Sequence, residues 1–318
     1  MRRPSPTLKL LFSTVLFLLL LCPSLVFTAE RLGTAQHPIC MKFVPSGEAQ
    51  IILEGGEDIA RRLHKLTGLH FKTSITTSYA AVIEAMGAGK VDIGWLATFS
   101  YVLAKQKYDV DLLTTVVRFG SPFYRVKIIT SVDSGIQTLD DLQGKKFAFV
   151  DAASTSGHLY PKTLLLSKGL NPDRLFAQSR FAGSHNAVIL SVLKGKVDAG
   201  ATYDDARAAV AKTYPEVFTQ LRVVAYTKNI SNDTVSARKD LDPVLKHKIR
   251  AGLIQLSKTP EGSKVLKQVY GISGLMDFDA LNEVAYRAHL EPMNYDTLFD
   301  PVREAGRLLN LDLKKANP

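Results

Sequence analysis

The chain has 318 residues, of which 46% are hydrophobic and 22% are charged, and its formal net charge is +10. A chain of this length can bury a large core and suits two domains of roughly 150 residues each. The positive charge favours an anionic small ligand or an anionic membrane surface. Nucleic acid is not expected as a partner, because the basic residues are scattered and form no block or aromatic-interleaved patch.

The first 29 residues have the pattern of a secretory signal peptide, with basic residues, an apolar run over 10–21 and a small residue, Ala29, at the end. The apolar run is shorter than the ~20 residues of a membrane span, although an uncleaved anchor is the alternative. Lipid anchoring at Cys22 is not favoured, because its neighbours do not fit the pattern. Cleavage would leave 37 basic against 30 acidic residues, and Cys40 alone could form neither an internal disulfide nor a metal motif. We therefore expect the mature protein to be soluble and exported.

Strand and helix patterns alternate along the mature chain, which favours parallel sheets with helices on both faces, an α/β fold. The C-terminal part becomes mostly helical, and its basic residues (Arg303, Arg307, Lys314 and Lys315) are expected on a solvated face. Predicted strands cover 39–44, 71–75, 91–96, 124–132, 145–150, 176–181, 197–202 and 221–226. Predicted helices cover 51–67, 80–88, 98–105, 139–142, 159–168, 185–193, 204–213, 243–257, 260–270 and 281–288.

Two segments, 79–94 and 185–200, resemble each other. Each has the pattern of a helix followed by a Gly-Lys pair and then by a strand that begins with an acid and a small residue. The shared Gly-Lys-Val-Asp sequence indicates that the similarity is not due to chance. Ligands of open α/β sheets bind beyond the carboxyl ends of the strands. Two similar lobes that face each other would therefore gather several helix starts around one cleft.

Residues 150–161 read as strand, turn and helix, with Ser154, Thr155 and Ser156 at the helix start. The first turn of a helix has backbone N–H groups without partners and carries partial positive charge. Serine and threonine hydroxyls add donors at the same place, so the segment suits a phosphate-like oxyanion. The alternative is that Ser154 or Ser156 is only a helix N-cap.

With these motifs together, the chain resembles the periplasmic substrate-binding proteins of ATP-binding-cassette (ABC) importers for phosphate, phosphite and phosphonates, over about residues 38–303. The resemblance implies the type II periplasmic binding fold, in which two α/β lobes flank a central cleft and the chain crosses between them twice, near 127–132 and 224–228. It implies lobe 1 over 30–128 and 229–318, and lobe 2 over 129–228. The motifs that carry it are Tyr79-Ala-Ala-Val-Ile-Glu-Ala-Met, Val91-Asp-Ile-Gly-Trp with Ser100-Tyr101, the segment 135–151, Ser154-Thr-Ser-Gly-His-Leu-Tyr-Pro, Gly183-Ser-His-Asn-Ala-Val and Ser231-Asn-Asp-Thr-Val.

The resemblance also implies ligand-binding residues. The hydroxyls of the Ser-Thr-Ser segment would bind the oxyanion, His185 would donate to a phosphoryl oxygen, and an aromatic residue would cap the ligand. Each has an alternative: His185 could face solvent, Tyr79 could be a core residue, and Phe99 or Ser100 could face the cleft in place of Tyr101. The residues so implied are Tyr79, Tyr101, Ser154, Thr155, Ser156 and His185.

Three acids complete the implied site. Asp204 and Asp205 follow a lobe 2 strand, and Asp233 follows the return crossing. In phosphonate binders of this family, acids near these places hold a ligand amino group, and an acid can also accept the proton of a monoprotonated phosphoryl group. Alternatively, Asp204 is the N-cap of the helix that follows it.

The implied function is that of an exported monomeric binding protein, which closes on a small phosphoryl anion and presents it to an ABC permease in the inner membrane. No metal or cofactor is expected. An enzyme is not expected, because the sequence contains no G-x-S-x-G, H-E-x-x-H, C-x-x-C or Walker motif. Two alternatives remain open: a binding protein that signals to a membrane histidine kinase, and a binder of another anion such as an organic carboxylate or a thiamine precursor.

Overall fold

The structure is a computed structural model that describes residues 32–204, 206–280, 283, 299–309 and 311. The expected signal segment, Cys22, Asp205 and nearly all of the predicted helix 281–288 lie outside the described residues. From Gly33 onward the chain forms one compact unit. Within the described part of the chain, no helix combines the length and the apolar character needed to cross a membrane.

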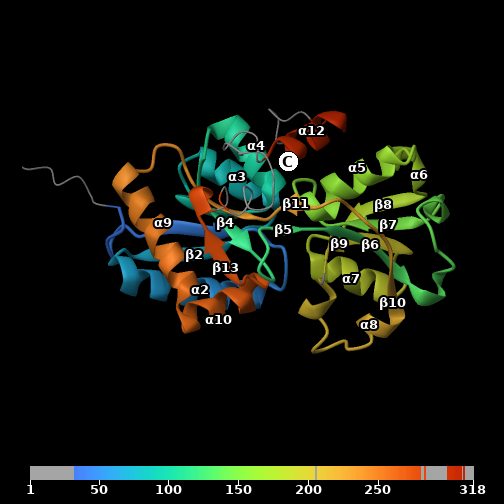
Figure 1. The fold of residues 1–318 in the computed structure, drawn as a ribbon, viewed down its shortest axis with the longest axis horizontal. Helices are drawn as coiled ribbons and strands as arrows, with labels where there is room; N and C mark the ends of the chain where they lie inside the picture. The colour runs from blue at the N-terminus through green and yellow to red at the C-terminus, as the bar shows by residue number, and fades with distance from the viewer. Residues whose placement is uncertain (1–31, 205, 281–282, 284–298, 310, 312–318) are drawn as a thin grey trace, which may run out of the picture. The chain divides into compact units, whose positions relative to one another are not determined.

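The first large sheet has six strands in the order β13-β4-β12-β3-β1-β2 (Figure 1). Strands β1, β2 and β3 are parallel, whereas β12 runs antiparallel to β3 and β4, and β13 antiparallel to β4. We call this sheet with its helices lobe 1. Its strands are β1 (Ile39–Phe43), β2 (Phe71–Ile75), β3 (Ile93–Leu96), β4 (Asp111–Val117), β12 (Thr234–Ala237) and β13 (Gly274–Met276). Its helices are α2 (Ala49–Thr67), α3 (Tyr79–Gly87), α4 (Thr98–Tyr108), α9 (Pro243–Lys258) and α10 (Pro260–Tyr270).

The second large sheet has five strands in the order β10-β6-β9-β7-β8. Strand β7 is parallel to β8 and β9, and β6 is antiparallel to β9 and β10. We call this sheet with its helices lobe 2. Its strands are β6 (Val126–Ser131), β7 (Lys146–Phe149), β8 (Gln178–Phe181), β9 (Ala199–Tyr203) and β10 (Leu221–Tyr226). Its helices and turns are η1 (Val132–Ser134), η2 (Asp140–Leu142), η3 (Thr155–Leu159), α5 (Tyr160–Ser167), α6 (Pro172–Leu175), α7 (His185–Leu193), η4 (Ala206–Ala209) and α8 (Val217–Gln220).

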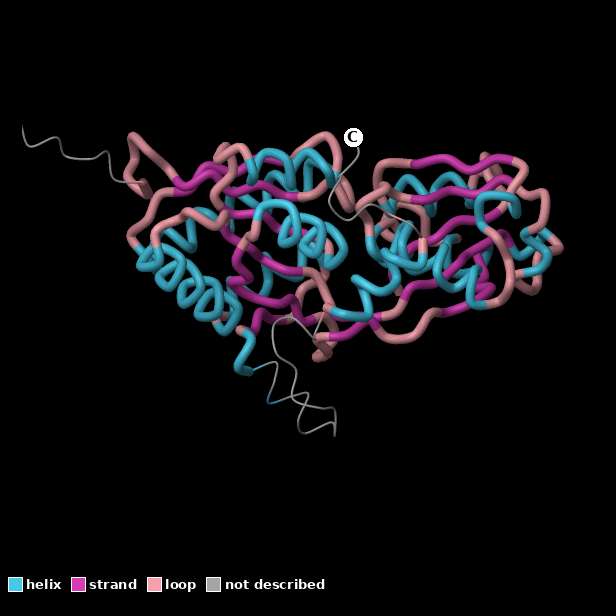
Figure 2. Tube along the Cα trace, turned by 90° about the horizontal axis from the view of Figure 1, so that it is seen from above, coloured by secondary structure: helices cyan, strands magenta, loops and turns pink. Residues whose placement is uncertain are grey.

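The chain passes between the lobes through a short antiparallel pair, β5 (Phe123–Tyr124) and β11 (Ile230–Ser231). This pair lies between the two large sheets (Figure 1). Figure 2 shows the two large sheets from a second direction. The predicted crossings at 127–132 and 224–228 instead fall largely on β6 and β10, within the lobe 2 sheet. The error has a physical reason: the apolar run through this region does not mark the residue at which one sheet ends and the next begins.

Three further expectations need correction. Strands β4, β12 and β13 were not predicted, although β4 is almost entirely buried in lobe 1. The predicted helix over 204–213 is only the single 3₁₀ turn η4 among the residues described. The predicted helix at 159 begins earlier, because η3 is a π-helical turn that continues directly into α5. Such turns are frequent at functional sites.

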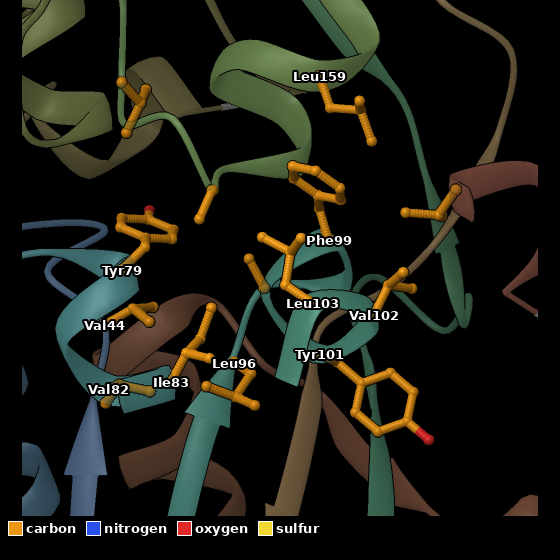
Figure 3. Close-up of a cluster of buried hydrophobic side chains, with 14 of the residues drawn as sticks. Val44, Tyr79, Val82, Ile83, Leu96, Phe99, Tyr101, Val102, Leu103 and Leu159 are labelled. Atoms are coloured by element: carbon orange, nitrogen blue, oxygen red, sulfur yellow. The ribbon is translucent and has the colours of Figure 1, made fainter. Parts of the chain in front are cut away.

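One cluster of buried apolar side chains extends through both lobes. Figure 3 shows part of this cluster, mostly from lobe 1 and including Leu159 of lobe 2, with Tyr79 and Tyr101 on opposite sides. Tyr101 packs against Phe299, with ring centroids 4.7 Å apart. Helix α12 (Asp300–Leu308) follows Phe299, buries Val302 and Ala305, and contacts α4 as well as α5 and η3. Helix α12 is therefore packed against both lobes rather than being only a solvated face of lobe 1, although Arg307 is exposed as expected, and Lys314 and Lys315 lie outside the described residues.

Candidate functional site

A cavity of about 420 Å³ is lined by residues of both lobes. Three helix starts reach it, those of α3, η3 and α7. A serine caps each of them: Ser78 Oγ accepts from the Ala81 N–H at 3.1 Å, Ser154 Oγ from the Gly157 N–H at 3.0 Å, and Ser184 Oγ from the Ala187 N–H at 3.2 Å.

The caps fix where each helix begins, so the first-turn N–H groups and the positive ends of the helix dipoles are brought to one place. The N-cap interpretation of Ser154 is confirmed, and the same residue also lines the cavity. Gly157 permits this geometry, because a Cβ there would lie 2.2 Å from the Cβ of Val150.

Ser156 and His185 meet inside the cavity. The Oγ of Ser156 lies 3.4 Å from Nε2 of His185, whose Nδ1 lies 2.9 Å from the Thr202 hydroxyl. His185 is only 3% exposed, so the alternative that it faces solvent is wrong. Burial, followed by the positive charge of Arg118, lowers the pKa of His185 to about 3. The imidazole is therefore neutral at pH 7 and offers one donor and one acceptor.

Two tyrosines add protonated hydroxyls to the cavity wall. Tyr79, the first residue of α3, is buried, and this burial together with the charges of Asp233 and Asp151 raises its pKa well above 10. Tyr124 in β5 also lines the cavity, and burial, followed by the charge of Asp233, likewise raises its pKa. Both phenols keep their protons at neutral pH, so each can donate a hydrogen bond. Tyr124 was not predicted as a site residue.

Arg118 is the charged residue that sequence reasoning missed. It follows β4 and lines the cavity, where Nη2 donates to Asp233 at 2.9 Å, Nη1 to the Asn232 side chain at 2.6 Å and Nε to the Tyr270 carbonyl at 2.9 Å. Burial, the largest single influence, lowers the pKa of Arg118, but the charge and hydrogen bond of Asp233 together with the neighbouring tyrosines raise it overall. Asp233 lies at the cavity wall as predicted, and the ion pair leaves the two residues together without net charge.

Three predicted residues do not line this cavity. Thr155 is turned toward α4, where its Oγ accepts from the Phe99 N–H at 2.8 Å. Tyr101 lies in the core against Phe299. Asp204 lines an adjoining cavity of about 150 Å³ and forms ion pairs with Arg125 at 3.0 Å and Lys127 at 3.6 Å.

The alternatives to Tyr101 are also placed. Phe99 and Ser100 are buried, and the Ser100 hydroxyl donates to the Ala153 carbonyl at 2.9 Å. Neither residue lines the cavity. Asp205 lies outside the described residues, so its role stays a prediction.

The two lobes contact each other at the helix starts. The N–H of Tyr79 in lobe 1 donates to the carboxylate of Asp151 in lobe 2 at 3.2 Å. The N–H of His185 in lobe 2 donates to the Ser46 carbonyl in lobe 1 at 3.0 Å. The structure therefore has the lobes together around the cavity. Among the described residues, no three His, Cys, Asp or Glu side chains gather in a way that could hold a metal ion.

Residues 41–282 match the family model described as "ABC transporter, phosphonate, periplasmic substrate-binding protein". The chain is 32% identical over 176 residues to the phosphate-import protein PhnD of Mycolicibacterium smegmatis, an alignment that covers 52% of this chain and 55% of that protein. It is 29% identical over 212 residues to the phosphonates-binding periplasmic protein of Escherichia coli, covering 65% and 62% respectively. The matched stretches thus span less than two thirds of these relatives.

Solved structures share the fold. PhnD1 of Prochlorococcus marinus in complex with methylphosphonate superposes with a TM-score of 0.72 at 18% identity, covering 86% of this chain and 98% of that one. A binding-protein component of an ABC phosphonate transporter from Pseudomonas aeruginosa gives 0.70 at 23% identity, covering 86% and 96%. The type II periplasmic binding fold is therefore confirmed. Since the family match covers most of the chain and its members are solute-binding proteins rather than enzymes, this chain belongs to the family of periplasmic substrate-binding proteins of phosphonate ABC transporters.

Proposed function

We propose that this protein, exported by its N-terminal signal segment, captures an organophosphonate between its lobes and delivers it to an ABC permease in the inner membrane. The observation that carries the proposal is the convergence of three serine-capped helix starts on one cavity. Helix starts suit phosphoryl oxygens because their N–H groups and dipoles attract negative charge.

The phosphoryl group would be held mainly by neutral donors. The candidate donors are the first-turn N–H groups of η3, the hydroxyls of Ser154 and Ser156, and the phenols of Tyr79 and Tyr124. All four side chains line the cavity. If the Thr202 hydroxyl donates to Nδ1 of His185, Nε2–H is left to donate to the ligand. Charge-assisted hydrogen bonds to an anion in a site shielded from water are stronger than bonds between neutral groups.

Asp233 supports a ligand that brings its own proton. Its carboxylate is at the cavity wall, where it can accept hydrogen bonds but cannot donate them, so the ligand must supply the hydrogen. A monoprotonated phosphonate, phosphate or phosphite has a P–OH group, and an aminophosphonate has an ammonium group. Sulfate at neutral pH has neither, so it offers no hydrogen for the Asp233 carboxylate to accept.

Among phosphoryl anions, cavity size favours a phosphonate. A single water needs roughly 10–15 Å³ of such a cavity, and about 420 Å³ is many times what a bare phosphate or phosphite requires. Relatives include proteins named for phosphate import, for phosphonates and for phosphite binding. The choice within this class therefore has to be measured.

Calorimetric titration of the ligand-stripped mature protein tests the proposal, with phosphate, phosphite, methylphosphonate, 2-aminoethylphosphonate and sulfate as ligands. We expect tight binding of a phosphonate, weakened at least tenfold in Ser156→Ala and in His185→Ala. Ser167→Ala is the matched control, because Ser167 is exposed on α5 and bonds only the Leu164 carbonyl among the contacts described. Absence of binding to every phosphoryl ligand would refute the proposed ligand class.

Delivery to a permease needs a separate test. The ligand should favour the closed state because it contacts both lobes, and this state would dock on the permease. Deleting the gene should abolish uptake of the radiolabelled ligand. If uptake persists while a transcriptional response to the ligand is lost, the protein is a sensor component instead of a transport component.

A further inference from the structure

A hairpin turn at the edge of the cavity carries an unexpected residue. Arg118 and Ser121 exchange two backbone hydrogen bonds of 2.9 Å, and the residues between them, Phe119 and Gly120, have φ values of 51° and 75°. Positive φ at both central positions defines a type I′ turn, in which the first position is normally Asn, Asp or Gly. A bulky side chain in this conformation is strained.

Packing within the protein does not explain the phenylalanine. Its side chain is 76% exposed, yet it lines both the central cavity and the adjoining cavity of about 150 Å³. An exposed ring contributes little apolar burial to the fold. Backbone strain that is not offset by apolar burial is a feature of ligand-binding sites.

The turn is held firmly in place. Arg118, at its first position, is anchored to Asn232, Asp233 and the Tyr270 carbonyl. The ring of Phe119 is therefore presented at a fixed part of the cavity edge, beside the Arg118–Asp233 pair.

Other apolar side chains line the same cavity. Ile51 and Val269 come from lobe 1 helices, and Ala208 and Ala209 come from the η4 turn of lobe 2. Beside charged and polar residues such as Glu48, Asp233 and Lys267, the lining thus contains hydrogen-bond donors at the helix starts and apolar surface that a phosphoryl group cannot use. The small alanines leave room for a substituent that an aromatic ring could cover.

We propose that Phe119 is a specificity-determining residue that packs on the organic substituent of the ligand, so that the cavity selects phosphonates with an apolar, and above all an aromatic, substituent. This inference rests on the proposed function, because it requires the phosphoryl group to bind at the helix starts. Aromatic rings gain from contact with each other beyond the area that they bury. When the ligand binds, its substituent covers the exposed ring of Phe119.

Titrations with phenylphosphonate and methylphosphonate test the inference in the wild type, Phe119→Asn and Phe119→Leu. Asparagine tolerates positive φ but removes the ring. We expect the wild type to bind phenylphosphonate more tightly than methylphosphonate. Phe119→Asn should weaken phenylphosphonate at least tenfold and methylphosphonate less than twofold, and Phe119→Leu should lie between. Without ligand, Phe119→Asn should unfold at the same or a higher temperature, because the strain is relieved.

Phe218→Asn is the matched control, since Phe218 is also exposed, at 51%, but lies on α8 and lines neither cavity. It should bind both phosphonates like the wild type. Equal loss of both ligands in Phe119→Asn, or a wild type that prefers methylphosphonate, would overturn the inference while the proposed function stands. A wild type that binds neither ligand, nor any other phosphoryl anion, would overturn the proposed function itself.

Discussion

The helix–strand units α3–β3 and α7–β9 have the same internal contacts in two different lobes. In each, a serine caps the helix and a glycine with positive φ follows it, Gly89 at 68° and Gly195 at 63°. In each, the acid of Gly-Lys-Val-Asp accepts from the first residues of the neighbouring parallel strand. Asp92 binds the Cys40 N–H and Asp198 the Lys146 N–H, both at 2.7 Å.

The two units differ in their surroundings and in the side chain that begins the helix. Asp92 is buried and also accepts from Arg238 Nε at 2.8 Å, whereas Asp198 is exposed. Tyr79 begins α3 and His185 begins α7. The repeated motif thus determines where the helix starts and how the strand is attached, while its first residue and the neighbouring elements determine its chemistry.

We expect the largest difference between the two units in the stability that each motif acid, Asp92 or Asp198, contributes. Asp92→Ala removes a buried acceptor from two donors and should lower the free energy of unfolding by about 3 kcal/mol. Asp198→Ala removes one exposed hydrogen bond, for which we expect about 1 kcal/mol or less. Urea unfolding of both variants measures the difference. Equal losses would show that the surroundings of Asp92 contribute nothing.

We expect the second-largest difference in stability between the two units from substitution of the strand glycines, Gly94 in β3 and Gly200 in β9. A Cβ at Gly200 would lie 2.6 Å from Val188 Cγ1 and 3.2 Å from the Ala148 carbonyl, whereas at Gly94 it would lie 2.6 Å from the sulfur of Met86. Valine is stiff and the backbone cannot move easily, but methionine can adapt. Gly200→Ala should cost about 2–3 kcal/mol and Gly94→Ala about 1 kcal/mol. Thermal unfolding tests this order, and the reverse order would contradict it.

The first helix residues should differ in their pH dependence. Burial, aided by Arg118, lowers the pKa of His185 to about 3 from an ordinary 6.5, so the folded state takes up its proton less readily than the unfolded chain. Stability is therefore retained above pH 6.5 and lost as the pH falls, by about 2 kcal/mol at pH 5 relative to pH 7.

Urea unfolding at pH 7 and pH 5 checks this loss. His185→Gln should remove that share of the pH dependence, although His158, whose pKa burial lowers to about 4, continues to titrate. Tyr79→Phe is the control, because burial raises the pKa of Tyr79 well above 10 and its removal should not change the slope. An unchanged slope in His185→Gln would contradict the assignment.

The contacts between the lobes give the smallest expected effect. Asp151→Ala removes the acceptor of the Tyr79 N–H, and the lobe 1 helix start should lose its partner across the cavity. We expect ligand affinity to fall three- to tenfold, about 1 kcal/mol. Asp151→Asn keeps an acceptor and should bind nearly as the wild type does. Identical affinities for all three proteins would show that this contact does not favour closure.

Local signals in the sequence were sufficient for much of this structure. Apolar patterns and glycine stops predicted α2, α7, α10 and β2 closely, because these features act within a few residues. The family resemblance, rather than these local signals, implied that Ser154, Ser156 and His185 share a site, and all three line the same cavity. The repeated Gly-Lys-Val-Asp predicted two similar lobes, and its acids have the same hydrogen bond in both.

Non-local contacts account for what was missed. Strand β12 lies between β3 and β4, which precede it by more than 100 residues, so its short Thr-Val-Ser-Ala sequence carries little signal of its own. Arg118 becomes a site residue only through Asn232, Asp233 and Tyr270, which lie 114 or more residues away in the chain. The packing of Tyr101 depends likewise on Phe299.

Helix α12 lies beyond the family-matched residues and contacts α4 of lobe 1 together with α5 and η3 of lobe 2. Figure 1 shows it at the edge of the lobes away from α10, whose residues line the cavity. Because α12 contacts both lobes at one edge, we expect the lobes to separate by a rotation about that edge. Ligand would then enter between α10 and η4, and α12 would not need to detach each time a ligand binds or leaves.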